Sequence, residues 1–160
     1  MWHRGAPHGR TVRSRSSPLP RPARSSPATG AAGYQQTRSA HRQETAEDYA
    51  LAIARLVEHR GEARVRDLAQ VMGVSHVTVV RIVKRLSDEK LVTTEPYKPV
   101  ALTAAGRRLA DTARKRHELV RDFLVSIGVP AKIAAIDAEG MAHHISDATA
   151  RAMRRAVGKR

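Results

Sequence analysis

Apolar residues recur at helical spacing along the chain from residue 44 onward. The first such stretch places Tyr49, Ile53 and Leu56 on one face with charged residues between them, and Gly61 follows as a stop signal. This pattern predicts an amphipathic helix over 44–60. Its apolar face requires a partner, so we expect further helices to pack against it.

Two shorter amphipathic stretches follow, separated by a glycine turn. Apolar side chains at positions i, i+3, i+4 and i+7 predict one helix over 65–72 and another over 75–89. Gly73 lies in the connection, and Ser75 is a favourable N-cap for the second helix. Two short helices joined by a tight turn containing glycine are typical of a helix-turn-helix.

In a helix-turn-helix, the second helix lies in the DNA major groove, with its N-terminal residues near the base edges. The apolar stripe of 75–89 leaves a basic, polar face outward, with no acidic residue before Asp88. Arg81 has the geometry for a bidentate contact with guanine. An ordinary solvated helix surface is the alternative interpretation. The predicted DNA-binding residues are Ser75, His76, Val77, Thr78, Arg81, Lys84 and Arg85.

A β-hairpin is predicted after the third helix. The β-branched runs 91–94 and 100–103 flank a turn-rich segment, 95–99, that contains two prolines. Lys98 at the tip is placed to contact the DNA backbone, and Tyr97 is expected to pack against the hairpin. Three helices followed by a hairpin make a winged helix.

The second half of the chain predicts a small helical domain. Thr103 caps a long helix over 104–126, Gly128 ends it, Pro130 opens a helix through about 143, and Ser146 caps a last one to about 157. The apolar positions of the long helix extend beyond what the winged helix needs, which indicates a partner. The predicted fold class is mainly α, with an N-terminal winged helix-turn-helix followed by an α-helical dimerisation domain.

Charge and composition divide the chain further. Residues 1–42 hold eight arginines and no acidic residue among Ser, Pro, Gly and Ala, and they predict a disordered basic tail. The expected domains are therefore 1–42 as tail, 43–103 as winged helix and 104–160 as the metal-binding and dimerisation domain. The formal net charge of the whole chain is +14, which favours a nucleic-acid partner, and an aromatic content of 3% favours duplex DNA over stacked single strands.

Several protein classes are disfavoured by the composition. The chain has no cysteine, so disulfides and thiolate metal sites are excluded and a reducing compartment is favoured. No apolar run is long enough to span a bilayer, and we expect a cytoplasmic protein with no membrane partner. The chain shows no phosphate loop, HExxH string or Ser/His/Asp arrangement, so we expect no enzyme activity, although a His and Glu cluster can activate water in a metallohydrolase.

Three residues of the second half form a candidate cation site. Glu139 and His143 are four positions apart and therefore share a helix face, and His117 lies on the preceding long helix. Imidazole and carboxylate groups of this kind suit manganese, iron or zinc. A Glu and a His at this spacing also occur as a simple surface pair, and spacing alone leaves that alternative open.

Several collinear strings resemble one known family over nearly all of 44–157. They include EDYALAIARLVEHRGEARVRDLAQVMGVS, RHELVRDFLVSIGV and DAEGMAHHIS. These strings are similar to the manganese transport regulators of the diphtheria toxin repressor family, which are metal-dependent transcriptional regulators. The resemblance implies a homodimeric repressor that binds Mn(II) and then holds a palindromic operator in double-stranded DNA near manganese transport genes.

The resemblance also implies a metal site, which this sequence retains only in part. The family's ligands fall on Asp48, His117, Glu139 and His143. Two further family carboxylates fall on Leu51 and Ala142, which cannot bind a cation, and an acidic position of relatives is Arg121 here. The reduced set predicts one metal site rather than two. The candidates to fill the gaps are His144, Glu118, Asp122 and water.

Three outcomes remain open for the metal response. The chain is a manganese sensor of reduced affinity, a sensor shifted toward a metal such as Fe(II) or Zn(II) that accepts more nitrogen ligands, or a winged-helix regulator that no longer depends on metal.

Overall fold

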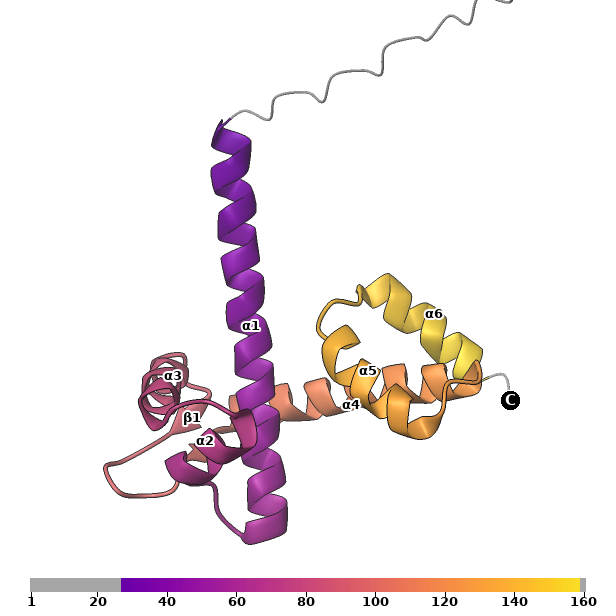
Figure 1. Ribbon diagram of the computed structural model, residues 1–160. Helices are drawn as coiled ribbons and strands as arrows, with labels where there is room; N and C mark the ends of the chain where they lie inside the picture. Colours follow the sequence, from indigo (N-terminus) through magenta and orange to yellow (C-terminus); the bar gives the residue numbers. More distant parts are fainter. Residues whose placement is uncertain (1–26, 159–160) are drawn as a thin grey trace, which may run out of the picture.

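The computed structural model describes residues 27–158, which form six helices and one two-stranded sheet (Figure 1). The chain runs through α1 (Pro27–Arg60), α2 (Val65–Met72), α3 (His76–Asp88), β1 (Val92–Thr93), β2 (Ala101–Leu102), α4 (Ala104–Ser126), α5 (Ala131–Met141) and α6 (Asp147–Val157). The predicted fold class, a winged helix-turn-helix followed by a helical domain, is confirmed.

The first hydrophobic core lies between α1, α2, α3 and the strands. Tyr49 and Ile53 of α1 pack here with Leu68 of α2 and Val79 of α3, and all four are at most 2% exposed. Burying each such side chain contributes roughly 1.5–3 kcal/mol. This core fixes α3 relative to α1, so the predicted reading helix and the helix carrying Asp48 belong to one packed unit.

The connection between α2 and α3 has the predicted helix-turn-helix geometry. Gly73 ends α2 in the left-handed region with φ +64°, a conformation that glycine adopts without strain. Ser75 then caps α3, because its side chain accepts a hydrogen bond from the backbone N–H of Thr78 at 3.2 Å. The outward face of α3 is left free of the core.

The wing is a short antiparallel hairpin in which Val92 pairs with Leu102 and Thr93 pairs with Ala101. Behind it, Thr103 caps α4 by accepting from the N–H of Gly106 and donates its hydroxyl proton to the carbonyl of Lys90 at 2.7 Å. Gly106 is required here, since a Cβ at this position would lie 2.0 Å from the carbonyl oxygen of Leu91. The wing and the long helix are thereby locked together.

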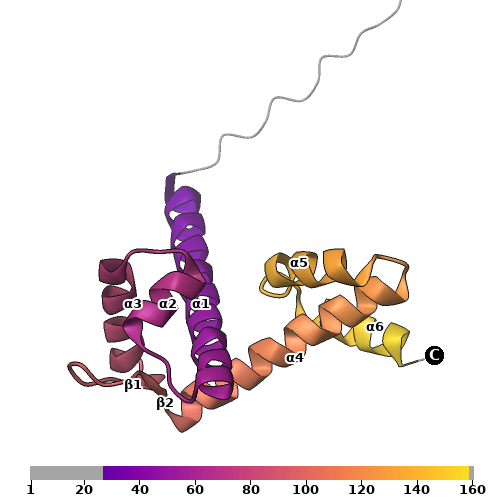
Figure 2. The ribbon, with the colours of Figure 1, turned by 60° about the horizontal axis from the view of Figure 1, so that its bottom comes forward.

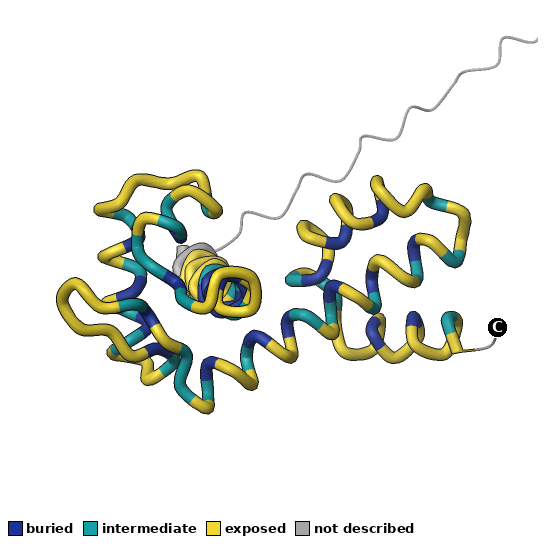
Figure 3. The backbone as a smooth tube through the Cα atoms, turned by 90° about the horizontal axis from the view of Figure 1, so that it is seen from below, coloured by how far each residue is buried: buried dark blue, intermediate teal, exposed yellow. Residues whose placement is uncertain are grey.

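Helix α4 joins the two halves of the molecule (Figure 2). Its first turns pack against α1, and its last turns pack against α5 and α6 around a second core that contains Val120, Leu124, Ala134 and Met153. Buried positions alternate with exposed ones along α4, as expected for a helix that packs on one side only (Figure 3).

Helix α1 is longer than the sequence pattern predicts. The prediction of disorder over 1–42 is wrong for 27–42, which continue α1 as a helix that extends beyond the body of the molecule (Figure 1); 1–26 lie outside the described residues. Pro27 is tolerated in the first helical turn, and adding residues to an already packed helix avoids the cost of nucleation. No helix within 27–158 is long and apolar enough to cross a membrane.

Candidate functional site

Four side chains predicted to bind metal meet where α1 approaches α4 and α5. Asp48 comes from α1, His117 from α4 and Glu139 from α5. His143 lies in a turn just past the end of α5 at Met141, so Glu139 and His143 do not share a continuous helix as predicted. The four residues are nevertheless close, and they join the DNA-binding half to the helical half.

His143 lies between two carboxylates of α1. Its Nδ1 is hydrogen-bonded to Oε2 of Glu47 at 3.0 Å, and its Nε2 is 3.0 Å from Oδ1 of Asp48. An ionised Glu47 can only accept, so Nδ1 donates to it and Nε2 faces Asp48. A lone pair and a carboxylate oxygen this close require a proton or a cation between them.

His117 is enclosed by the surrounding helices. Its side chain is 8% exposed, and neither ring nitrogen has a hydrogen-bond partner within the described part of the chain. Nδ1 lies 3.3 Å from Oε2 of Glu139 without hydrogen-bond geometry. The ring stands edge-on to His143, with 5.2 Å between the ring centroids. Burial lowers the pKa of His117, which favours the neutral form that metals bind.

Burial acts on Asp48 as well. It raises the pKa of Asp48, and the neighbouring His143 acts in the opposite direction. A buried carboxylate of raised pKa gains when a cation replaces its lost hydration. Glu139 is more exposed, and its second oxygen, Oε1, lies 3.4 Å from Nη2 of Arg55.

The positions where the family's carboxylates are missing are filled by apolar side chains. Leu51 and Ala142 are both buried, at 2% and 0% exposure. Arg121 forms an ion pair with the neighbouring Asp122 at 2.8 Å, and Glu118 is exposed. His144 is exposed and lies 3.9 Å from Glu44. Within residues 27–158, no hydrogen bond or ion pair joins His144, Glu118 or Asp122 to the four predicted ligands.

The four predicted ligands offer the right types of donor atom for one divalent cation, but they are not arranged around a common point. Within residues 27–158, no group of three or more His, Asp or Glu side chains is already arranged to hold a metal ion. The four predicted ligands instead lie as two pairs, Asp48 with His143 and His117 with Glu139. The buried, unpartnered nitrogens of His117 are the observation that favours an ion, because buried polar atoms are normally satisfied.

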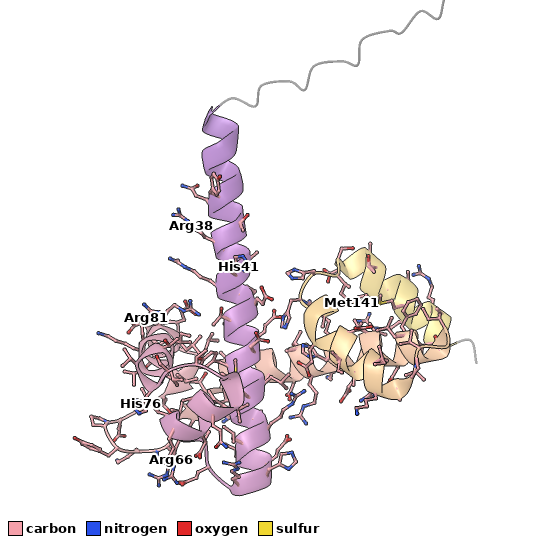
Figure 4. The ribbon with its side chains drawn as sticks, viewed as in Figure 1. Arg38, His41, Arg66, His76, Arg81 and Met141 are labelled. Atoms are coloured by element: carbon pink, nitrogen blue, oxygen red, sulfur yellow. The ribbon has the colours of Figure 1, made fainter. Side chains whose placement is uncertain are left out.

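The predicted DNA-binding residues lie along α3, on the side away from the first core. His76, Val77, Arg81 and Lys84 are exposed, and Figure 4 shows His76 and Arg81 on the outer side of α3. Ser75 and Thr78 share a hydroxyl contact of 2.9 Å, so both serve the cap as well as the surface.

Arg85 differs from the other predicted DNA contacts. Its side chain is only 31% exposed, its Nε lies 3.6 Å from Oε1 of Glu89, and its Nε and Nη2 are buried without hydrogen-bond partners in the described part of the chain. Arg85 thus lies partly against the protein, and only a part of its guanidinium group faces solvent.

A groove of about 760 Å³ runs between α3 and the wing. It is bordered by basic side chains from three elements, namely Arg64 and Arg66 near α2, Lys84 of α3 and Lys98 of the wing loop. Tyr97 is 99% exposed with φ +65°, so it does not pack against the hairpin. The wing loop therefore presents Tyr97 and Lys98 to solvent.

Sequence patterns missed several residues of both sites. Glu47 is adjacent to Asp48, but only its contact with His143 reveals a role. Arg55 belongs to the charged stripe of α1 and gave no separate signal. Arg64 and Arg66 lie before and within α2, and their place beside the wing depends on tertiary folding.

The fold and the two sites define a winged-helix transcriptional regulator with a helical metal-binding and dimerisation domain. Residues 42–100 match the family described as iron dependent repressor, N-terminal DNA binding domain. Residues 103–160 match its metal binding and dimerisation domain. The chain belongs to the iron-dependent repressor family, which confirms the predicted membership of the diphtheria toxin repressor class.

Two individual proteins show the similarity in more detail. The chain is 45% identical over 122 residues to the transcriptional regulator MntR of Escherichia coli O157:H7, covering 76% of this chain and 79% of the relative. It is 36% identical over 100 residues to the HTH-type transcriptional regulator MntR of Bacillus subtilis, covering 62% and 70%. These relatives are named as transcriptional regulators, not as enzymes.

Solved structures with the same fold include two manganese-linked proteins. One is described as a manganese-dependent transcriptional repressor complex with manganese, at 30% identity and a TM-score of 0.65, covering 71% of this chain and 52% of that one. Another is the manganese regulator SloR, at 28% identity and a TM-score of 0.61, covering 71% and 53%. The chain spans about half the length of these two solved structures.

Proposed function

We propose that this chain is a Mn(II)-responsive repressor that binds a palindromic operator as a homodimer in the cytoplasm and controls manganese transport genes. The observation that carries the proposal is the buried His117, whose two ring nitrogens lack partners in the described part of the chain, beside the Asp48–His143 pair. The manganese-linked names of the relatives support the choice of metal.

The proposed ligands are Asp48, His117, Glu139 and His143. A divalent cation bound there supplies the positive charge that joins the two pairs and offsets the carboxylates. Glu47 holds the ring of His143 through Nδ1, which leaves Nε2 free to coordinate. Burial keeps His117 neutral and therefore available as a ligand.

The ligands connect elements that belong to different halves of the molecule. Asp48 lies on α1, which shares a core with α3, whereas His117 and Glu139 lie on α4 and α5. Tightening these contacts fixes the DNA-binding half relative to the dimerisation half. In a dimer this sets the spacing of the two α3 helices, and only one spacing fits two half-sites.

The dimer contact is proposed on the outer face of α5. Ile133 and Ile136 are 48% and 63% exposed, and Met141 is 39% exposed near the end of the helix. Exposed aliphatic side chains at helical spacing are typical of a surface that is covered in the assembled protein.

On the DNA, Arg81 is proposed to read bases, with His76, Val77 and Thr78 beside it. Lys84 and the exposed part of Arg85 contact phosphates, and Ser75 orients the start of α3. The basic groove between α3 and the wing supports a duplex partner.

A second candidate is the same regulator responding to Fe(II) or Zn(II). Two of the four proposed ligands are imidazoles, and the apolar Leu51 and Ala142 supply no oxygen, so the donor set is richer in nitrogen than a manganese site requires.

Metal titration of the full chain without DNA separates these candidates. Mn(II), Fe(II) and Zn(II) are competed against a chromophoric chelator, with the His117→Ala variant as the control that removes the enclosed ligand. The proposal expects one Mn(II) per protomer, lost in the variant. Binding that is unchanged in His117→Ala contradicts this site.

A further inference from the structure

Arg55 places a fixed positive charge beside the proposed metal ligands. It lies on α1 two turns beyond Asp48, and its Nη2 is 3.4 Å from Oε1 of Glu139 on α5. Oε2 of the same carboxylate faces His117 at 3.3 Å. Glu139 is therefore shared between a proposed metal ligand and a guanidinium group.

The surroundings of Arg55 make this contact more than a peripheral ion pair. Arg55 borders the hollow of about 510 Å³ that contains Asp48 and His143, and also the hollow of about 330 Å³ that contains His117. Glu139 borders both hollows as well. Any cation that reaches Glu139 from either side meets the charge of Arg55.

The face of α1 toward the site carries no carboxylate between Asp48 and Arg55, although Glu44, one turn before Asp48, borders the same hollow as Asp48. Between Asp48 and Arg55 it carries Leu51, which is buried against the same hollow. Two carboxylates of α1 contact His143: Asp48 faces its Nε2, and Glu47 is hydrogen-bonded to its Nδ1. Arg55 supplies a charge where the site has few carboxylates.

We propose that Arg55 is a built-in cation that competes with the metal ion for Glu139 and so sets the metal affinity of the site. The inference rests on the proposed function. In the metal-free chain, the Arg55–Glu139 contact links α1 to α5. Binding of a divalent cation requires Glu139 to exchange this partner, or to keep a like charge next to the ion. Loss of the Arg55–Glu139 contact and repulsion between Arg55 and the metal ion both weaken metal binding. For one positive charge this close to the ion in a partly solvated site, the effect is roughly tenfold.

If Arg55 and Glu139 formed an ordinary surface ion pair, removing it would not change metal affinity. Such pairs change stability little and have no effect on a ligand bound elsewhere. Arg60 offers this comparison on the same helix, because its side chain is similarly exposed, at 52% against 50% for Arg55. It borders the hollow of about 510 Å³ as well, but its ion pair, at 3.2 Å, is with Asp67 of α2 and not with a proposed metal ligand.

The test compares Arg55→Met, Arg55→Lys and Arg60→Met with the wild-type full chain. Arg55→Met keeps the apolar stem and removes the charge, whereas Arg55→Lys keeps the charge. Mn(II) affinity is measured without DNA by competition with a chromophoric chelator, and thermal unfolding of the metal-free proteins checks the fold. We expect Arg55→Met to bind Mn(II) about tenfold more tightly, with Arg55→Lys and Arg60→Met within about twofold of wild type.

The outcomes separate this inference from the proposed function. If wild type binds Mn(II) and Arg55→Met binds no tighter, the role of Arg55 is overturned and the metal site stands. If Arg55→Met binds Mn(II) and wild type does not, the result supports competition by Arg55 strong enough to prevent metal binding. If neither protein binds Mn(II), both the inference and the proposed Mn(II) site are overturned.

Discussion

The Nε2 atom of His143 lies 3.0 Å from Oδ1 of Asp48, and this contact connects the turn after α5 to the helix that shares a core with α3. Such a contact would couple metal binding in the helical domain to the DNA-binding surface, because α1 and α3 share one hydrophobic core. We therefore propose that metal binding and DNA binding are coupled through Asp48.

Removing the carboxylate of Asp48 is expected to uncouple metal binding from operator binding. Asp48→Asn keeps the size of the side chain but weakens its attraction for a divalent cation. We expect at least about a tenfold loss of Mn(II)-stimulated operator binding. Glu58→Gln on the same helix is the matched control, since Glu58 pairs with Arg114 outside the cluster. Equal stimulation of Asp48→Asn and wild type contradicts the role of Asp48.

Glu47 is expected to act by positioning His143. Glu47→Ala removes the acceptor for Nδ1 and leaves the ring free to rotate or change tautomer, which typically weakens metal affinity about 10–100-fold. Glu47→Gln retains an acceptor oxygen and should lose less. Mn(II) titration of both variants checks this order, and an equal loss in the two would assign the effect to charge alone.

Arg81 is expected to read sequence, whereas Lys84 is expected to bind phosphate. Arg81→Ala should weaken specific operator binding by about 1–3 kcal/mol and reduce discrimination against altered half-sites, with the fold intact. Lys84→Ala should weaken binding to all duplexes similarly and lower the dependence on salt. Anisotropy titrations on operator and scrambled duplexes measure both effects. Uniform weakening by Arg81→Ala removes it from base recognition.

The ion pair between Glu58 and Arg114 gives a pH-dependent link between α1 and α4. A hydrogen bond from Arg114 at 2.6 Å lowers the pKa of Glu58 below its ordinary value of 4.5. Its stabilising effect is therefore complete above the ordinary value and is lost as the pH falls through the lowered pKa. Both side chains are substantially exposed, so the effect is small.

Glu58→Gln checks this relationship. The variant should lose less unfolding free energy than wild type between about pH 7 and about pH 3.5, as measured by urea denaturation. Identical pH dependence of the two proteins would show that the pair contributes nothing.

The outer face of α5 is expected to be required for dimer formation. Ile136→Glu places a charge at an aliphatic side chain that is 63% exposed in the single chain. We expect a shift from dimer to monomer in light scattering, since burying an unpaired charge costs several kcal/mol. Val71→Glu on α2 alters an exposed valine outside this face and should remain dimeric. A dimeric Ile136→Glu protein would place the interface elsewhere.

Helices with strong apolar periodicity or a clear cap can be predicted from the sequence, whereas contacts between distant parts of the chain cannot. The helix over 65–72 and the long helix over 104–126 coincide with α2 and α4, because amphipathic spacing and the Thr103 cap are local signals. The extension of α1 back to Pro27 was missed, since the sequence over 27–42 shows no regular spacing of large apolar residues. Local composition there resembled a disordered tail.

The candidate metal site was predicted in its ligands but not in its supporting contacts. Four residues came from a resemblance to a family, and the structure brings them together as two pairs. The contacts of Glu47 and Arg55 join residues far apart in the chain, and no pattern within one helix encodes such a contact. The inward position of Arg85 likewise depends on how α3 packs against its neighbours.

Operator binding of the full chain with and without metal tests the central claim most directly. Fluorescence anisotropy on a labelled palindromic operator from a manganese-transporter promoter is measured in EDTA and then with Mn(II) in excess. The account predicts that Mn(II) strengthens binding at least about tenfold, which corresponds to about 1.4 kcal/mol of coupling. Equal affinity in EDTA and in Mn(II) would leave a winged-helix DNA-binding protein and contradict the metal-responsive regulator.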